Sequence, residues 1–328
     1  SDAIGGVIYI SPDSFVDGSP QVEFGSLYNS NYSGLTNNLG LKGSVGGINY
    51  IFQGSYVDNG NFSTPEEEIE NTFFENTDFK AALGYSSGKF ISELRFNYSE
   101  STIGIPHMED DHDDHDDHGD DDDDHGDDDH DDDHDDDHDD HEGEHSDAAM
   151  DLDLNTTSVD LKYVFAKTEK TEFVIGSSFL SQENKNYGEE ELVPNAKKND
   201  FGIFGLAHFH GKVWDIMVGL RTDYRRIQKR QFDENYGSLT SSLGLKTDLG
   251  NSGILRINYS TGYRAPNLSE LFADGVHHGT ARYYVGDQNL SEEKSSQIDF
   301  SISTFTSESQ FGLDLFANSL KDYIYLNP

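Results

Sequence analysis

The residues best suited to chemistry lie together in one acidic segment. Between Glu109 and Asp147 the chain carries 23 Asp and three Glu, with no Lys or Arg. Ten histidines lie in or beside this segment: His107, His112, His115, His118, His125, His130, His134, His138, His141 and His145. Neutral imidazole and carboxylate oxygen are good ligands for borderline divalent cations such as Zn²⁺. The composition of residues 107–147, called the acidic tract below, therefore predicts metal binding.

The spacing of these histidines indicates many weak sites. Three of them from His112 are three residues apart, and three from His130 are four apart. On a helix, either spacing would place neighbouring imidazoles on one face. Asp is a poor helix former, however, and neighbouring carboxylates repel one another, so we expect the metal-free tract to be disordered. Metal would gather two His and one or two Asp locally, while the other carboxylates raise the local cation concentration.

Other interpretations of the tract fit its composition less well. A plain solvated acidic loop needs Asp or Glu but not ten histidines. A calcium-binding EF-hand loop has Asp or Asn directly before its Gly, whereas His118 and His125 precede Gly119 and Gly126. Copper(I) favours Met and Cys, and the chain has three Met and no Cys. Ligand type leaves Ni²⁺, Co²⁺ and Cu²⁺ open beside zinc.

Further candidate ligands lie outside the tract. The stretch "ADGVHHGT" contains His277 and His278, and "YGEEELVP" contains Glu189 and Glu190. We expect one His and one Glu from these stretches to bind metal directly after the tract has captured it. The alternative is that the two His are surface residues and the Glu run is a solvated turn. His208 and His210 lie beside a short turn, and we interpret them as structural.

The composition excludes several classes of function. The 328 residues have a formal net charge of −41, and about −15 is left without the 26 carboxylates of the tract. A negative chain disfavours nucleic acid as a partner. The absence of Cys excludes disulfides, thiolate zinc sites and Cys nucleophiles. We find no nucleophile–base pair and no phosphate-binding loop, so an enzyme is the least supported class. No apolar run approaches the ~18–20 residues of a transmembrane helix.

Apolar and polar residues alternate with period two along most of the chain, which is typical of β-strands. The pattern predicts about thirteen strands, among them "FISELRFNYS" (90–99) and "FGIFGLAHF" (201–209). Most span 9–14 residues, and a tilted membrane-spanning strand needs about 9–11. The connections alternate between short turns and longer loops, the latter including the acidic tract and residues 228–236. This favours an antiparallel transmembrane β-barrel with the tract on its outer side over a soluble β-sandwich.

Two motifs resemble those of TonB-dependent outer-membrane receptors. "SDAIGGVIYI" at the start resembles the end of that family's plug domain, where the strand leads into the barrel. "GYRAPNLSELF" and the following "VGDQNLSEEKS" resemble its mid-barrel signature. The matching positions are Ala3, Ile4, Gly5, Gly6, Arg264, Ala265, Pro266, Asn289 and Leu290.

The resemblance implies an all-β fold and a partial barrel of a 22-stranded receptor. Residues 1–12 would end the plug and 13–328 would form barrel wall, with an extracellular His/Asp-rich loop at about 101–153. We expect the chain to be a fragment of a longer receptor. The family imports its ligands across the outer membrane of Gram-negative bacteria, so the implied partners are outer-membrane lipid and the TonB complex.

Three functions stay open within this reading. The tract and the two loop stretches resemble the zinc-uptake branch of the family, with zinc as the transported ion. Uptake of haem, or of a metal chelate or siderophore, is the alternative. Haem receptors often place a His between the two mid-barrel motifs, where His277 and His278 lie. The second motif here reads "GDQNL" and lacks the Pro typical of those receptors. A non-transporting surface adhesin or metal buffer is the third.

Overall fold

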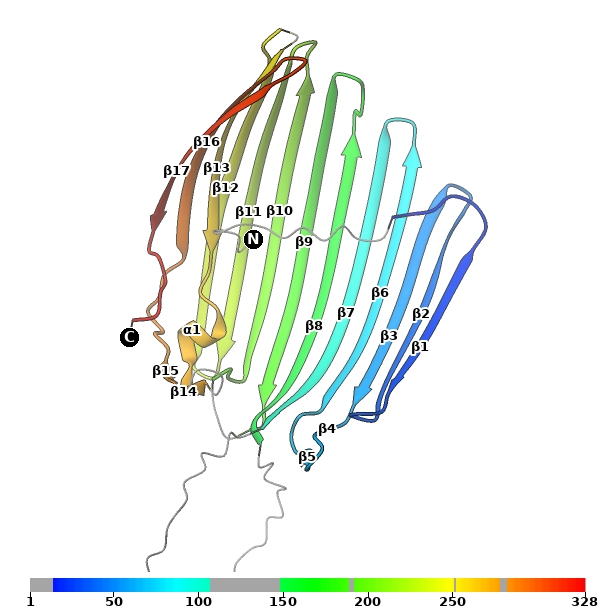
Figure 1. Cartoon of the computed structure of the whole chain (residues 1–328), viewed down its shortest axis with the longest axis vertical. Coiled ribbons are helices and arrows are strands. Elements are labelled where there is room, and N and C mark those ends of the chain that lie inside the picture. Colours follow the sequence, from blue (N-terminus) through cyan, green and yellow to red (C-terminus); the bar gives the residue numbers. More distant parts are fainter. Residues whose placement is uncertain (1–13, 107–147, 189–191, 251, 278–281, 328) are drawn as a thin grey trace, which may run out of the picture.

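The computed structural model describes residues 14–106, 148–188, 192–250, 252–277 and 282–327 (Figure 1). Thirteen long strands form one sheet. They are β1 (Gln21–Asn29), β2 (Gly34–Val45), β3 (Ile48–Asn59), β6 (Phe74–Ser87), β7 (Phe90–Pro106), β8 (Ala148–Phe165), β9 (Thr171–Asn186), β10 (Ala196–His210), β11 (Trp214–Lys229), β12 (Phe232–Asp248), β13 (Gly253–Arg264), β16 (Glu293–Phe305) and β17 (Gln310–Lys321).

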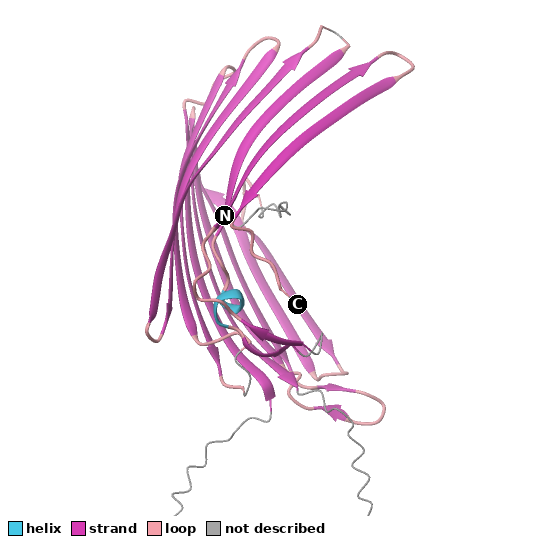
Figure 2. Cartoon of the chain, turned by 90° about the vertical axis from the view of Figure 1, so that its left-hand side faces the viewer, coloured by secondary structure: helices cyan, strands magenta, loops and turns pink. Residues whose placement is uncertain are grey.

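Each long strand pairs with the next one along the chain, and all pairings are antiparallel. The all-β fold and the thirteen strands predicted from the alternation are therefore confirmed. β1 and β17 form the two edges of this sheet, which curves strongly (Figure 2). Smaller elements lie in the connections: β4 (Phe62–Ser63), β5 (Glu68–Ile69), α1 (Leu268–Phe272), β14 (Asp274–His277) and β15 (Arg282–Val285).

One face of the sheet is apolar and exposed. Successive side chains of a strand point to opposite faces, and directly paired residues share a face. Leu94 of β7 pairs with Leu161 of β8, and Phe201 of β10 pairs with Phe179 of β9. All four side chains are more than 40% exposed. Apolar groups at this exposure on neighbouring strands suit contact with lipid.

The opposite face is polar and lies on the concave side. Asp200 pairs with Arg225, one position along from the exposed Phe201. Ile227, two residues beyond Arg225, shares its face and is fully buried in the cluster that contains α1 residues Leu271 and Phe272. Because α1 lies inside the curve of the sheet (Figure 2), the polar face is the concave one.

The connections at one end of the sheet are short turns, at the top of Figure 1. In the turn between β2 and β3, Gly46 and Gly47 have φ of 59° and 83°. Two consecutive positive φ values define the tight hairpin turn whose twist matches its strands, and glycine adopts them without strain. The strand ends that flank the tract and the β13–β16 connection lie at the other end.

At that other end the strands run further than predicted. The strands beside the tract reach Pro106 and start again at Ala148, well inside the predicted loop limits of about 101–153. Apolar residues still alternate with other residues there, as at Ile103 and Ile105 of β7 and at Leu152 and Leu154 of β8. The ladder continues through these residues, and Thr102 donates a hydrogen bond across it to Asp153.

The predicted long connection at 228–236 is wrong. β11 continues to Lys229 and β12 begins at Phe232, which leaves a two-residue turn. Arg230 in this turn has a φ of 48°, a positive value of the kind that two-residue hairpin turns require. The polar sequence is typical of a loop, but Arg226 of β11 and Asp233 of β12 form a bidentate ion pair across the strands.

The connection between β1 and β2, residues 30–33, is also short. Long loops therefore do not alternate strictly with short turns along the chain.

In the described part of the chain, no helix is both long and apolar enough to cross a membrane.

Candidate functional site

The two strand ends that flank the acidic tract lie side by side at the end of the sheet. Pro106 of β7 pairs with Ala148 of β8, next to a register shift in the ladder. Pro106 fits at a strand end because proline has no N–H to give to the next rung. The tract itself, with all ten of its histidines from His107 to His145, lies outside the described residues.

The strands at the base of the tract are packed by two neighbouring connections. Gly104 of β7 donates its N–H to the carbonyl of Phe73 at 3.1 Å. On the other side, the Tyr187 N–H donates to the Asp151 carbonyl at 2.8 Å. A Cβ on Gly188 would lie only 2.5 Å from the Cα of Met150, so only glycine lets this loop approach the strand. The tract is thus inserted into a packed strand end.

The candidate ligands outside the tract are only partly described. Glu189, Glu190 and His278 lie outside the described residues, as do Ala3, Ile4, Gly5 and Gly6. His277 is the last residue of β14, where its backbone pairs with Arg282 of β15. The flanks of residues 189–191 and the β14–β15 hairpin lie at the same end of the sheet as the base of the tract (Figure 1). The structure therefore places the described flanks of the three candidate regions at one end of the sheet, and the convergence of the candidate ligands on a single ion stays a prediction.

Arg264 organises the connection that carries β14 and β15. Its Nη1 donates to both carboxylate oxygens of Glu270, at 2.9 and 2.8 Å, and its Nε donates to Glu293 Oε2 at 2.6 Å. Glu293 is 2% exposed, and its other oxygen accepts the backbone N–H of Ile324 at 2.5 Å. Charge-assisted bonds of this kind are the strong ones in proteins. The arginine of the "YRAP" motif thus ties β13, α1, β16 and the segment after β17 together.

Helix α1 begins at a complete capping box. The Asn267 side chain accepts the N–H of Glu270 at 2.8 Å, and the Glu270 carboxylate accepts the N–H of Asn267 at 2.8 Å. Glu270 therefore serves both the helix start and Arg264. Such a box satisfies two backbone N–H groups that a helix start leaves free, and it lets a five-residue helix form where the sequence alone shows no helical period.

Beneath α1 lies a hydrophobic cluster that fixes the connection to the sheet. Its buried members are Ile227, Tyr236, Tyr263, Ala265, Leu271 and Phe272, with Leu290 packed against them. The rings of Phe232 and Phe272 meet edge to face, 4.8 Å between centroids. Ala265 and Leu290 of the recognised motif are thus packing residues, and Pro266 is fully buried. The Asn289 side chain donates to Asp287 Oδ1 at 3.0 Å.

The concave face carries charged side chains in pairs, one across neighbouring strands and one along β11. Arg225 donates twice to Asp200, at 2.7 and 2.8 Å. Arg221 donates to Asp223 at 2.8 Å and to Ser178 Oγ at 3.0 Å. These side chains line a hollow of about 260 Å³. A polar, hydrogen-bonded inner wall is typical of barrels that enclose water or a plug.

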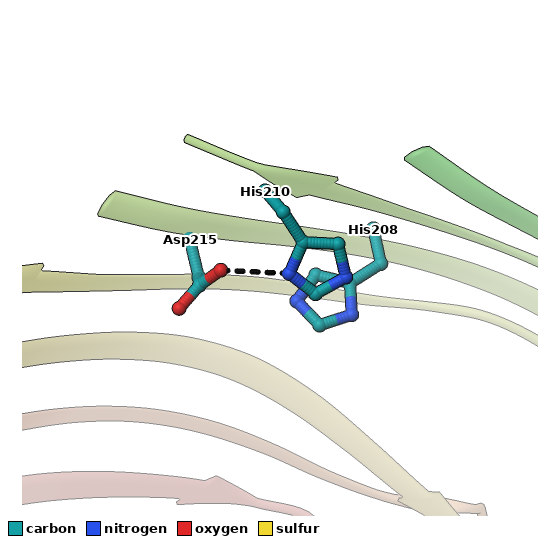
Figure 3. Close-up of side chains that lie close together, drawn as sticks. All are labelled: His208, His210 and Asp215. Carbon is teal, nitrogen blue, oxygen red and sulfur yellow. Dashed lines mark hydrogen bonds and ion pairs between the residues drawn. The ribbon is translucent and has the colours of Figure 1, made fainter. Parts of the chain in front are cut away.

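A group at the short-turn end was not predicted as a site. His208, His210 and Asp215 offer ligand atoms that all lie within 4.8 Å of one another (Figure 3). The sequence held a signal for it, since His-x-His places two imidazoles on one face of a strand, and a three-residue turn then returns the chain to Asp215.

A curved antiparallel sheet with a lipid-compatible convex face and a polar concave face is the wall of a transmembrane β-barrel. Residues 12–328 match the family described as "TonB dependent receptor-like, beta-barrel". The chain belongs to this family, whose barrels lie in the outer membrane of Gram-negative bacteria.

Solved structures with a similar fold come from the same family. The ferric citrate transporter FecA, in its unliganded form, is 10% identical with a TM-score of 0.53, and the match covers 91% of this chain and 46% of that one. The copper transporter OprC is 12% identical with a TM-score of 0.49, covering 95% and 55%. The Serratia marcescens hemophore receptor HasR, solved with its hemophore HasA and heme, is 10% identical with a TM-score of 0.48, covering 93% and 49%. The chain spans about half the length of these proteins.

Proposed function

We propose that this chain is barrel wall of a TonB-dependent receptor that imports a divalent metal ion, with zinc as the first candidate. The acidic tract faces the outside of the cell and captures the ion. The observation that carries the proposal is the composition of the tract, ten histidines among 26 carboxylates, because imidazole with carboxylate suits zinc and its neighbours in the transition series.

The position of the tract supports a capture role. It is inserted between Pro106 and Ala148, which are paired neighbours at the end of the wall. A segment anchored at both ends beside the mouth holds its ions close to the entrance. Many weak sites release an ion readily, and the surrounding carboxylates raise the local concentration of cations. Capture should therefore matter most when the external concentration limits the rate.

Transfer into the barrel would then use His277 or His278 with Glu189 or Glu190. The β14–β15 hairpin that carries His277 is attached to the Arg264 network through α1, so it offers a supported position. A ligand on a supported element holds a fixed geometry better than one on the tract. TonB, as the energy source, and outer-membrane lipid are the partners expected of the family.

The test compares zinc uptake in cells that depend on this receptor. One variant lacks residues 112–145, a second carries Asn in place of the ten histidines of the tract, and a third carries His277→Ala with His278→Ala. We expect the first two to slow uptake only when zinc is scarce, and the third to slow it also when zinc is ample. The His-to-Asn variant is the matched control for the deletion, because it keeps the length and the carboxylates.

The same variants separate zinc from haem. A Soret band on the purified wild-type receptor that disappears in the His277/His278 double variant, with zinc uptake unchanged in cells, would replace zinc import with haem import. Zinc binding without any receptor-dependent uptake would instead support a surface metal buffer.

A further inference from the structure

His208 and His210 lie at the end of β10, and Asp215 lies at the start of β11. The two histidines are two residues apart on one strand, so their side chains share a face. Asp215 is the cross-strand partner of His210. This face is the concave one. His208 and His210 are each an even number of residues from Asp200 on the same strand, so they share its face, and Asp200 pairs with Arg225 on the concave side. The group therefore lies inside the curve of the wall, at the short-turn end and away from the tract (Figure 1).

The three side chains already lie close to a ligand geometry. His210 Nδ1 is 2.8 Å from Asp215 Oδ1, and the two imidazole rings have centroids 3.9 Å apart (Figure 3). Ligand atoms around a tetrahedral zinc, at about 2.0–2.1 Å from the metal, are about 3.4 Å from one another. The atoms here lie within 4.8 Å of one another, so small side-chain rotations would bring all three onto one ion.

The surroundings leave room for an ion and for a fourth ligand. The side chains of His210 and Asp215 are 37% and 32% exposed, so a hydrated ion can reach them from the concave side. His208 pairs with Met217 of β11 and with Glu172 of β9, and both share its face. A thioether and a carboxylate therefore stand at the positions from which a further ligand would come.

We propose that His208, His210 and Asp215 form a divalent metal site on the inner wall, at the end opposite the tract. Two imidazoles and one carboxylate favour zinc, copper(II), nickel or cobalt over calcium and magnesium, which take oxygen ligands. Binding at this site does not depend on import. If the proposed import function holds, the site is a second binding site for the ion, at the end of the barrel through which the ion leaves.

Lys246 gives this proposal a specific signature. Its Nζ is 3.6 Å from Asp215 Oδ2, so its charge opposes a cation at the carboxylate. At about 4 Å in a water-like medium, the interaction of two unit charges changes a binding constant by about fivefold, and the effect on a divalent ion is larger. Replacing Lys246 should therefore tighten metal binding. A His210–Asp215 pair that serves only to close the hairpin would show no such effect.

The test uses the receptor in detergent, without residues 112–145 and with His107→Ala, Glu189→Gln, Glu190→Gln, His277→Ala and His278→Ala, so that the other candidate ligands are absent. Cobalt(II) is titrated and followed by its visible d–d absorption, and zinc affinity is obtained by competition. We expect one site per chain. Loss of a group that only hydrogen-bonds to a metal ligand lowers metal affinity by about 10–100-fold. The double change His208→Asn with His210→Asn removes two direct ligands, so it should lower cobalt and zinc affinity by at least about tenfold.

Two lysine variants complete the design. Lys246→Met should tighten binding at least about fivefold. Lys162→Met should leave binding unchanged, because Lys162 lies on the concave face of the sheet but on β8. Absence of cobalt binding, binding that survives the double His change, or equal affinity in the Lys246→Met variant would each overturn the proposal. None of these results depends on uptake in cells, so a failure of zinc import would be seen separately.

Discussion

Glu293 should hold the β13–β16 connection closed, and replacing it by Gln tests this. The Glu293 side chain is 3% exposed and accepts from Arg264 Nε and the Ile324 N–H. Removing one partner of a buried ion pair costs about 3–5 kcal/mol. Arg264 keeps Glu270 and is itself 20% exposed, so about half of this, about 2 kcal/mol, is expected for Glu293→Gln. That corresponds to about a thirtyfold rise in local opening.

Hydrogen exchange followed by mass spectrometry on the receptor in detergent measures this opening. Peptides from residues 265–277 and 282–292 should exchange faster in Glu293→Gln, while peptides from β7 to β9 keep their protection. Glu270→Gln is the matched control. Glu270 is more exposed, at 24%, and Arg264 keeps Glu293, so about 1 kcal/mol, or about fivefold, is expected. Unchanged exchange in Glu293→Gln, or equal effects of the two changes, would refute the role assigned to this network.

Three further outcomes are expected. Gly188→Ala should destabilise the packing of β8 at the base of the tract by about 1–3 kcal/mol, because the added Cβ would clash with the Met150 backbone. Peptides beginning at Ala148 should then exchange faster, and unchanged exchange would contradict this expectation. Deleting residues 112–145 should leave the unfolding temperature unchanged, because Pro106 and Ala148 already pair and a short loop can join them; a clear fall would show that the tract is part of the fold. An epitope placed within residues 110–145 should react with antibody on intact cells, and reaction only after permeabilisation would reverse the proposed orientation.

The sequence was sufficient for the sheet because period-two alternation is a direct consequence of strand geometry. It placed all thirteen long strands and most of the short turns. It was insufficient where strands leave the apolar band, as at Arg226 and Asp233. There, residues 225–235 contain only two apolar residues, Ile227 and Phe232, so alternation disappears while backbone pairing continues. The alternation of apolar and polar residues shows which part of a strand has an apolar environment on one face, and it does not show where the strand begins and ends.

The candidate site was predictable only in part, for different physical reasons. The "YRAP" motif identified Arg264, but its partner Glu293 is 29 residues away along the chain, and only strand register brings the two together. For His208 and His210 the signal was local. A hairpin with a short turn at residues 211–213 places Asp215 opposite His210. The register of the predicted strands would therefore have been enough to find the group, which was interpreted as structural.

Zinc bound per receptor tests the central claim most directly. The wild-type receptor and the variant with Asn in place of the ten tract histidines are compared at about pH 7.5 and about pH 5.5, on either side of the imidazole pKa of about 6.5. At the higher pH the wild type should bind several more zinc ions than the variant. At the lower pH it should lose that excess, because protonated imidazole cannot bind while most Asp stays ionised. Equal zinc content in the two proteins at the higher pH would mean that carboxylates alone hold the metal, and would contradict capture of zinc by the histidines.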